Sequence, residues 1–273
     1  MGRRRALCVG INKYKNYPDA ALRGCVNDAK EMSAVLTRYL NFAKQDITVL
    51  TDRQATKTAI MKKLTAMVQG AQEGKYDYLV FSLSSHGTQI VDVGGDERDK
   101  ADEAFCPYDL AEKKGQWDPR HIIIDDELHD LFVQLPKNVL LEVYLDTCHS
   151  GTGLKAIDLL LSRQPRYLPP PSLAAFKDAQ RRPTDTLRTM LVRANHPNHI
   201  LWAACRDSQT SADALLDGKW HGAFTYFYCR ELETAKGDLT RRELLKRVRA
   251  QLAENEFTQV PQLEYKATLR GNF

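Results

Sequence analysis

The chain lacks any apolar run near the roughly 20 residues that a membrane-spanning helix requires, and it has little excess charge of either sign. A formal net charge of +4 is too small to indicate nucleic acid or an anionic lipid surface as a partner. The hydrophobic fraction of 43% and the charged fraction of 27% are typical of a globular chain. Because the basic start passes directly into an apolar run without an export signal, we expect a cytoplasmic protein that binds neither nucleic acid nor membranes.

Cysteine is present but not in the spacing of a structural metal site. The six cysteines include no CxxC pair, which argues against structural zinc. Cys8, Cys205 and Cys229 lie within apolar runs, where a thiol is most often a small buried hydrophobe. Each remaining cysteine must therefore be judged by its neighbours.

Strand-like and helix-like segments alternate along most of the chain. The apolar runs predict strands at 6–11, 46–50, 78–81, 139–145 and 199–204, with a closing edge strand at 262–265. The intervening periodicity predicts helices at 25–40, 58–68, 125–135, 223–232 and 241–253, the last beginning with capping-box spacing at Thr240. This alternation is typical of an α/β protein with a mainly parallel sheet covered by helices on both faces.

Composition changes in the region 155–199. It holds six of the eleven prolines, with eight basic and only three acidic residues, and it reads as a long basic linker with at most one short helix. We therefore predict a single domain, 1–273, in which a linker at 155–198 separates a larger part at 1–154 from a smaller part at 199–273.

Two polar constellations follow the strongest predicted strands. Ser84-Ser85-His86-Gly87 comes after YLVFSL, and Asp146-Thr147-Cys148-His149-Ser150-Gly151 comes after VLLEVYL. In an open α/β sheet, functional groups gather beyond the carboxyl ends of the strands. If these two strands are neighbours, His86 and Cys148 face one another across a crevice.

A thiol beside an imidazole is the minimal apparatus for nucleophilic acyl transfer. The backbone N–H groups of Gly87 and Cys148 are natural donors to the oxyanion of such a reaction. Taken alone, either side chain at a strand end is more often structural, but their joint occurrence favours a dyad. His149 is the rival base, yet the side chains of adjacent residues point apart, so we favour His86 as the base. We expect that the reaction itself needs no cofactor.

The segments SSHGTQ, DTCHSG, ACRDSQTSADA and GAFTYF together resemble the signatures of metacaspases and their prokaryotic relatives, the orthocaspases, within the caspase-like cysteine peptidases. The resemblance runs from about Arg5 to Tyr265, apart from the linker. It implies a caspase-like α/β/α sandwich with six main strands, a Cys148/His86 dyad and a monomer. It also implies cleavage of peptides and proteins after Arg or Lys rather than after Asp.

Acidic residues near the crevice agree with a basic substrate. Two carboxylates, Asp28 and Asp146, would hold an arginine by charge-assisted hydrogen bonds. By resemblance, the primary specificity pocket comprises Cys25, Asp28, Ser84 and Asp146. The alternative is that Asp28 only caps a helix and Asp146 only supports a turn.

The stretch Asp92–Glu103 predicts an acidic loop, and hard oxygen ligands suit calcium. By resemblance, Asp102, Asp125 and Asp126 match an activating Ca²⁺ site. The match is incomplete, because the family's further aspartate falls near Lys155, with Asp158 shifted from it. Asp125 is equally explained as the cap of a helix.

The linker supplies candidate substrates for an enzyme that cuts after basic residues. We therefore hypothesise self-cleavage at one of its basic residues: Arg163, Arg166, Lys177, Arg181, Arg182, Arg188 or Arg193. A basic solvated connection is the alternative reading. For the whole chain, the leading hypothesis is a cysteine endopeptidase, and the alternative is a non-catalytic caspase-like binding or regulatory module.

Overall fold

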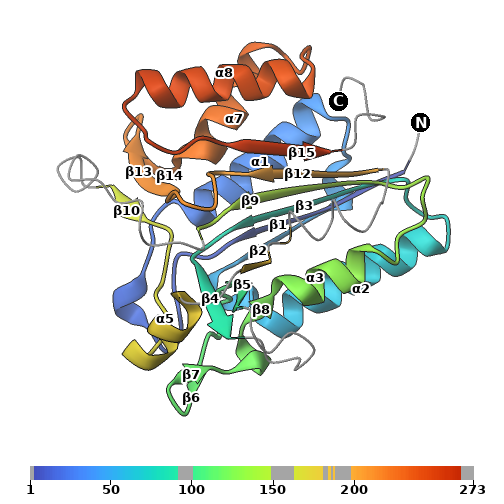
Figure 1. The fold of residues 1–273 in the computed structure, drawn as a ribbon. Helices are drawn as coiled ribbons and strands as arrows, with labels where there is room; N and C mark the ends of the chain where they lie inside the picture. The colour runs from blue at the N-terminus through green and yellow to red at the C-terminus, as the bar shows by residue number, and fades with distance from the viewer. Residues whose placement is uncertain are drawn as a thin grey trace.

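The structure, a computed structural model, describes residues 3–91, 101–148, 163–180, 184–185, 187 and 198–265. Its centre is a six-stranded sheet in the order β15-β12-β9-β3-β1-β2 (Figure 1). All neighbouring pairs are parallel except β12 with β15. The strands are β1 (Arg4–Gly10), β2 (Ile47–Thr51), β3 (Tyr78–Ser84), β9 (Leu140–Asp146), β12 (His199–Ala203) and β15 (Gln262–Tyr265). The predicted α/β class, the mainly parallel sheet and the edge strand are confirmed.

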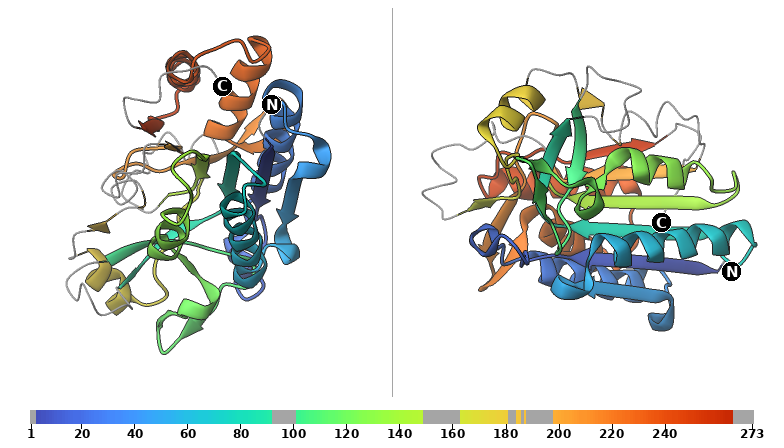
Figure 2. Two further views of the ribbon diagram at one scale, coloured as in Figure 1. Left: turned by 90° about the vertical axis from the view of Figure 1, so that its right-hand side faces the viewer. Right: turned by 90° about the horizontal axis from the view of Figure 1, so that it is seen from below.

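Helices cover both faces of this sheet, which gives the three layers seen in Figures 1 and 2. On one face lie α1 (Cys25–Tyr39), α7 (Ala223–Thr234) and α8 (Arg241–Glu254), and on the other lie α2 (Lys57–Gln72) and α3 (Asp125–Phe132). The predicted capping box is present, since Glu243 N–H donates to Thr240 Oγ1 and Thr240 N–H donates to Glu243 Oε2. Short 3₁₀ turns occupy Pro18–Ala20, Lys44–Asp46, Asp52–Gln54 and Pro119–His121.

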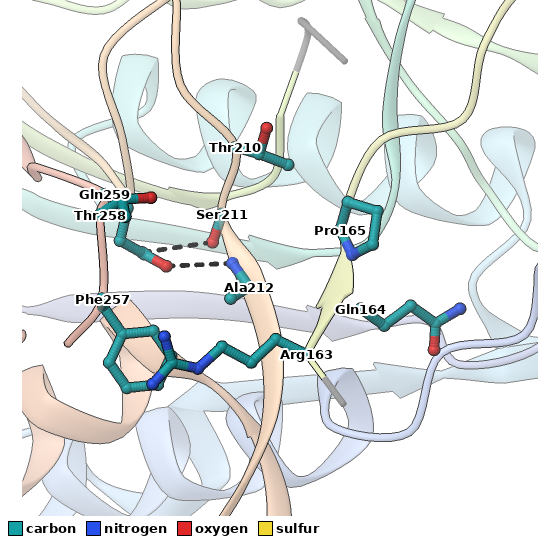
Figure 3. Close-up of a pocket in the computed structure, with 9 residues that line it drawn as sticks. All are labelled: Arg163, Gln164, Pro165, Thr210, Ser211, Ala212, Phe257, Thr258 and Gln259. Carbon is teal, nitrogen blue, oxygen red and sulfur yellow. Dashed lines mark hydrogen bonds between the residues drawn. The ribbon is translucent and has the colours of Figure 1, made fainter. Parts of the chain in front are cut away.

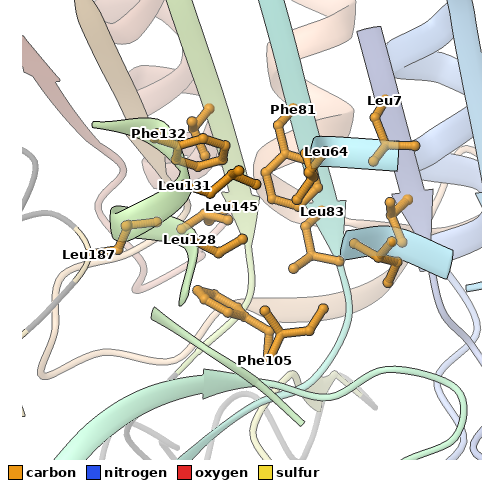
Figure 4. Close-up of a cluster of buried hydrophobic side chains, with 14 of the residues drawn as sticks. Leu7, Leu64, Phe81, Leu83, Phe105, Leu128, Leu131, Phe132, Leu145 and Leu187 are labelled. Carbon is orange, nitrogen blue, oxygen red and sulfur yellow. The ribbon is translucent and has the colours of Figure 1, made fainter. Parts of the chain in front are cut away.

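The core consists of two apolar layers, because successive side chains of a strand point to opposite faces. Along β1, Leu7 and Val9 pack towards α2 and α3, while Ala6 and Cys8 pack towards α1 and α7. Figure 4 shows the first layer, where Phe81 of β3 meets Leu64 and Phe132. Each large side chain buried in this way contributes about 1.5–3 kcal/mol. The two layers hold in place the edge of the sheet that the carboxyl ends of the parallel strands form.

Short strands that periodicity did not predict surround that edge. They are β4 (Gly87–Val91), β5 (Ala101–Phe105), β6 (Glu112–Lys113), β7 (Gln116–Trp117), β8 (Ile123–Ile124), β10 (Gln164–Pro165), β11 (Thr184–Asp185), β13 (Ala212–Leu216) and β14 (Lys219–Gly222). The prediction of an acidic loop is therefore wrong for residues 101–103, because they belong to β5, which pairs with β4 and β8. Residues 92–100 of the predicted loop lie outside the described residues. In the described part of the linker, α5 (Leu173–Gln180) is a short helix, and Leu187 outside it is also helical, where at most one short helix was expected. No helix within the described ranges is long and apolar enough to cross a membrane.

Candidate active site

The two polar constellations lie side by side. Strands β3 and β9 are parallel neighbours in a register that pairs Ser84 with Asp146. Their ends therefore bring His86 and Cys148 to the same edge, as the sequence predicted. Both side chains are buried, with exposed fractions of 3% and 1%.

The Cys148 thiol lies against the segment that leads into β13. Its Sγ accepts a hydrogen bond from Ser211 N–H and is 3.6 Å from Ser211 O. A second thiol is close, because Cys205 Sγ is 3.8 Å from Cys148 Sγ. Within the described part of the chain, no hydrogen bond joins Cys148 to His86.

The geometry of His86 defines its tautomer. Its Nε2 is 2.8 Å from Ala20 O, and since a carbonyl only accepts, Nε2 carries the proton. The other ring nitrogen, Nδ1, is buried with no hydrogen-bond partner, which leaves its lone pair available. Burial lowers the pKa of His86 to about 4, so the ring is a neutral proton acceptor at pH 7. The backbone N–H of His86 donates to Tyr14 Oη at 2.9 Å, which fixes the turn after β3.

An arginine from the linker fills the acidic pocket. Arg166 is fully buried, and its Nη2 lies 2.6 Å from Asp28 Oδ2 and 2.8 Å from Asp213 Oδ1. Its Nη1 lies 3.3 Å from Asp146 Oδ1 and donates to Asp146 O at 3.1 Å. Three carboxylates thus surround one guanidinium in a site without solvent.

Each of these carboxylates also accepts hydrogen bonds from the protein. Gly222 N–H donates to Asp28, the backbone N–H groups of Arg23 and Gly24 donate to Asp213, and Thr225 and Ser211 donate to Asp146. Burial raises the pKa of Asp28 above its usual range, although Arg166 and His221 lower it. Even with Arg166 inside, the pocket holds three carboxyl groups against one guanidinium.

The remaining pocket residues predicted from the sequence are close by. Burial raises the pKa of the Cys25 thiol well above its usual value, and the charge of Arg166 opposes that rise. Ser84 is buried at the end of β3 opposite Asp146. Asp28 is not a helix cap, because α1 begins at Cys25 with Gly24 as its N-cap. A Cβ at Gly222 would lie 2.3 Å from Asp146 Oδ2 and 2.4 Å from Arg166 Nη1, so glycine there leaves room for the guanidinium.

Asp213 and Ser211 were missed as pocket residues. Both lie in the segment ACRDSQTSADA, which the sequence analysis quoted only as a family signature. The available signal was a carboxylate at the start of an otherwise apolar strand, ADALL. Asp213 is fully buried there, and a buried charge is expected to have a partner.

The backbone of Arg166 is held as firmly as its side chain. Its carbonyl oxygen accepts hydrogen bonds from the N–H of Gly87 at 2.9 Å and of Cys148 at 3.2 Å. Its own N–H donates to Ser211 O at 3.0 Å, and the preceding β10 pairs antiparallel with β13. On the far side, Leu168 N–H donates to Gly87 O at 2.9 Å. The segment 163–168 therefore crosses the site held on both sides of the Arg166–Tyr167 peptide bond.

The candidate calcium ligands are only partly assembled. Asp125 Oδ2 is buried without a hydrogen-bond partner. Burial raises the pKa of Asp125 well above its usual value, and the charges of Glu103, Asp102 and Asp126 raise it further. Asp125 is the first residue of α3 and not its cap, which is Ile124. The oxygen donors suit Ca²⁺, yet within the described ranges no three acidic, histidine or cysteine side chains are arranged to hold a metal ion.

Several predicted residues lie outside the described residues. They are His149, Lys155, Asp158, Arg181, Arg182, Arg188 and Arg193. Lys177 lies in α5. Of the candidate cleavage sites, only Arg166 is described within the acidic pocket.

The class of protein follows from comparison with known proteins. The family model described as the caspase domain matches residues 3–273. Among solved structures, a Geobacter sulfurreducens protein, GSU0716, superimposes with a TM-score of 0.66 at 23% identity, over 96% of this chain and 92% of that one. Caspase-1 from Spodoptera frugiperda superimposes with a TM-score of 0.60 at 14% identity, over 97% of this chain and 88% of that one. The chain belongs to the caspase-domain family of cysteine peptidases.

Its curated relatives include fungal metacaspases. Metacaspase-1 of Coccidioides immitis is 31% identical over an alignment of 306 positions, gaps included, that covers 99% of this chain and 63% of that protein. Metacaspase-1B of Neosartorya fischeri is 32% identical over an alignment of 297 positions, gaps included, that covers 96% of this chain and 69% of that protein. The chain thus spans about two thirds of the length of these relatives.

Proposed function

We propose that the protein is an endopeptidase that cleaves peptide bonds after Arg, and after Lys more slowly, through Cys148 and His86. The observation that carries this proposal is Arg166, whose guanidinium contacts Asp28, Asp146 and Asp213 while its carbonyl accepts from Gly87 and Cys148. A planar guanidinium makes bidentate contacts that an ammonium does not, which favours Arg over Lys. An aspartate in the same pocket would meet three like charges.

The proposed reaction needs only the peptide substrate and water. His86 Nδ1 takes the thiol proton, and the Cys148 sulfur forms a bond to the substrate carbonyl carbon. The N–H groups of Gly87 and Cys148 stabilise the oxyanion. The C–N bond then breaks, the leaving amine takes the proton from His86, and water hydrolyses the thioester to a carboxylate and a free thiol.

Self-cleavage is the first reaction to expect, and we assign it to the Arg166–Tyr167 bond. Intact mass spectrometry of the purified protein should give fragments 1–166 and 167–273, whereas Cys148→Ala stays a single chain. Arg166→Gln should prevent this cut, and Lys177→Gln is the matched control that should leave it. The same fragments from Cys148→Ala would refute self-cleavage.

Short fluorogenic peptides test specificity in trans. Arginyl substrates should be hydrolysed, lysyl ones more slowly and aspartyl ones not at all, and Cys148→Ala should abolish all activity. If neither peptides nor a thiol-directed peptide inhibitor react, the alternative of a non-catalytic binding module is favoured. Faster hydrolysis of the aspartyl peptide would overturn the proposed pocket.

We also propose that Ca²⁺ bound near Asp125 activates the enzyme. The buried, unpaired oxygen of Asp125 and the neighbouring carboxylates support it, because a divalent cation would offset their repulsion. Added CaCl₂ should raise the melting temperature of Cys148→Ala, and Asp125→Asn should remove that increase. An equal response to MgCl₂, or none to CaCl₂, would contradict a calcium site.

We further propose that the enzyme acts as a cytoplasmic monomer on peptide and protein substrates, without nucleic acid or membrane partners. Size-exclusion chromatography with light scattering should give a mass near 31.0 kDa for Cys148→Ala. A mass of twice that value would contradict the monomer.

A further inference from the structure

A second arginine of the linker occupies a site of its own, three residues before Arg166. The guanidinium of Arg163 lies over the ring of Phe257, 3.7 Å from its centroid, as Figure 3 shows. Arg163 Nη1 donates to Glu256 O at 2.7 Å, and Nη2 donates to Asn255 O at 2.8 Å. The residue is only 9% exposed. An aromatic face and two carbonyls thus enclose one cation.

The end of α8 builds this cation site independently of Arg163. The helix ends at Glu254, and the chain turns back through Glu256, whose φ is 60°, so that Phe257 N–H donates to Leu252 O at 2.8 Å. This turn leaves the carbonyls of Asn255 and Glu256 free to accept from outside the helix. The helix dipole places partial negative charge at the same end. Phe257 is fixed by edge-to-face packing on Phe227, at 6.0 Å between centroids.

The spacing between the two arginines agrees with an extended substrate. Gln164 and Pro165 lie between them and pair with Asp213 and Ala212 of β13. In an extended strand, residues three positions apart point to opposite sides. One arginine therefore reaches the acidic pocket while the other reaches the end of α8.

We propose that this cation site is a second specificity subsite, which selects substrates with a basic residue, Arg before Lys, at the fourth position before the scissile bond. Together with the acidic pocket it recognises the pattern Arg-x-x-Arg. The inference rests on the proposed function, because it adds a subsite to the same peptidase. A cation over an aromatic ring that also donates two hydrogen bonds should be worth about tenfold in kcat/KM.

The test uses two matched fluorogenic peptides, Arg-Gln-Pro-Arg and Ala-Gln-Pro-Arg, with the self-processed protein. We expect the first to be hydrolysed about tenfold faster, and Phe257→Leu to bring the ratio of the two rates close to one. Equal rates in the wild type would overturn the subsite and leave the peptidase intact, whereas no hydrolysis of either peptide would overturn the proposed function itself.

Self-cleavage provides a second measurement that does not depend on the stability of the Phe257 variant. Arg163→Ala should slow cleavage after Arg166 about tenfold, and Arg163→Lys should restore part of the rate. Lys177→Ala, which replaces an exposed cation of α5 in the same linker, is the control and should change the rate less than twofold. The rate of Arg163→Ala is compared with this control as well as with Gln164→Ala, which also loses a hydrogen bond to Ala21 O. If Arg163→Ala cleaves as fast as these two variants, the subsite is wrong.

Discussion

Two buried arginines of this protein have opposite surroundings. Arg241 of α8 pairs with the carboxylate of Glu142 of β9, with Nε and Nη2 each 2.9 Å from it. Glu142 also accepts from Tyr78 Oη at 2.6 Å and from Trp202 Nε1 at 2.7 Å. Arg166 meets three carboxylates and comes from a segment that we propose is cut. The first arrangement balances charge within permanent elements of the fold, while the second keeps acidic groups in excess.

The two sites also differ in what happens when the cation leaves. Removing Arg241 would leave Glu142, which is fully buried on β9 between β3 and β12, without its charged partner. After the self-cleavage that we propose, the segment 163–168 could leave the site, and water or another guanidinium could then reach the three carboxylates. A buried ion pair of the first kind joins a helix to the sheet, whereas we propose that one of the second kind binds the substrate. The following predictions test that difference.

The largest effect should come from removing each arginine in a Cys148→Ala background. Arg241→Gln leaves a buried charge unpaired and should lower the free energy of unfolding by about 3–5 kcal/mol. Arg166→Gln should lower it by less, because the segment 163–168 can detach from the site and let water reach the three carboxylates. In urea titrations, millimolar agmatine should restore stability to Arg166→Gln only. Equal losses, with no recovery in either variant, would show that both pairs are structural.

A smaller effect is expected from removing one carboxylate of each site. Asp213→Asn loses a charge-assisted hydrogen bond to the substrate guanidinium and should lower kcat/KM for an arginyl peptide about 30-fold, from a bond worth about 1.5–3 kcal/mol. Glu142→Gln should lower the melting temperature and leave kcat/KM within about twofold. A similar loss of activity in both variants would contradict the assignment of Asp213 to the pocket.

The smallest effect concerns pH. Burial raises the pKa of Asp28 above 3.8, so protonation of Asp28 at acidic pH should remove a negative charge from the pocket and raise the KM for arginyl peptides severalfold. Although burial raises the pKa of Glu142, Arg241 and three hydrogen bonds leave it below 4.5. Ionised Glu142 contributes its full stabilisation above pH 4.5, and this stabilisation is lost as the pH falls through the lowered pKa of Glu142. KM is the readout, because protonation of His86 also lowers kcat.

Asp28→Asn should remove this change in KM and Glu142→Gln should not. Melting temperatures should be measured over the same pH range, where Glu142→Gln should change their pH dependence and leave that of KM unchanged. If KM and stability change together in the wild type, the two sites do not titrate separately.

The sequence predicted the main elements with few errors, because hydrophobic periodicity is a local property. The strands at 78–84 and 140–146 and the helices at 25–39 and 241–254 differ from expectation by only a few residues at their ends. The short strands around the site were not predicted, because most have only two residues and the others mix polar with apolar residues in runs of four or five. Strand β10 exists only through its pairing with β13.

The candidate site, like the fold, was only partly predictable from the sequence. His86 and Cys148 were predictable, since each follows a strong strand, and parallel neighbouring strands end at one edge. Asp213 and Phe257 were not, because they are 47 and 94 residues away from the linker arginines that they contact. The sequence by itself determined the layers, the edge at which chemistry gathers and a basic linker. Only the tertiary structure decided which arginine of that linker enters the acidic pocket, because partners for a charge are chosen by proximity after the sheet has closed.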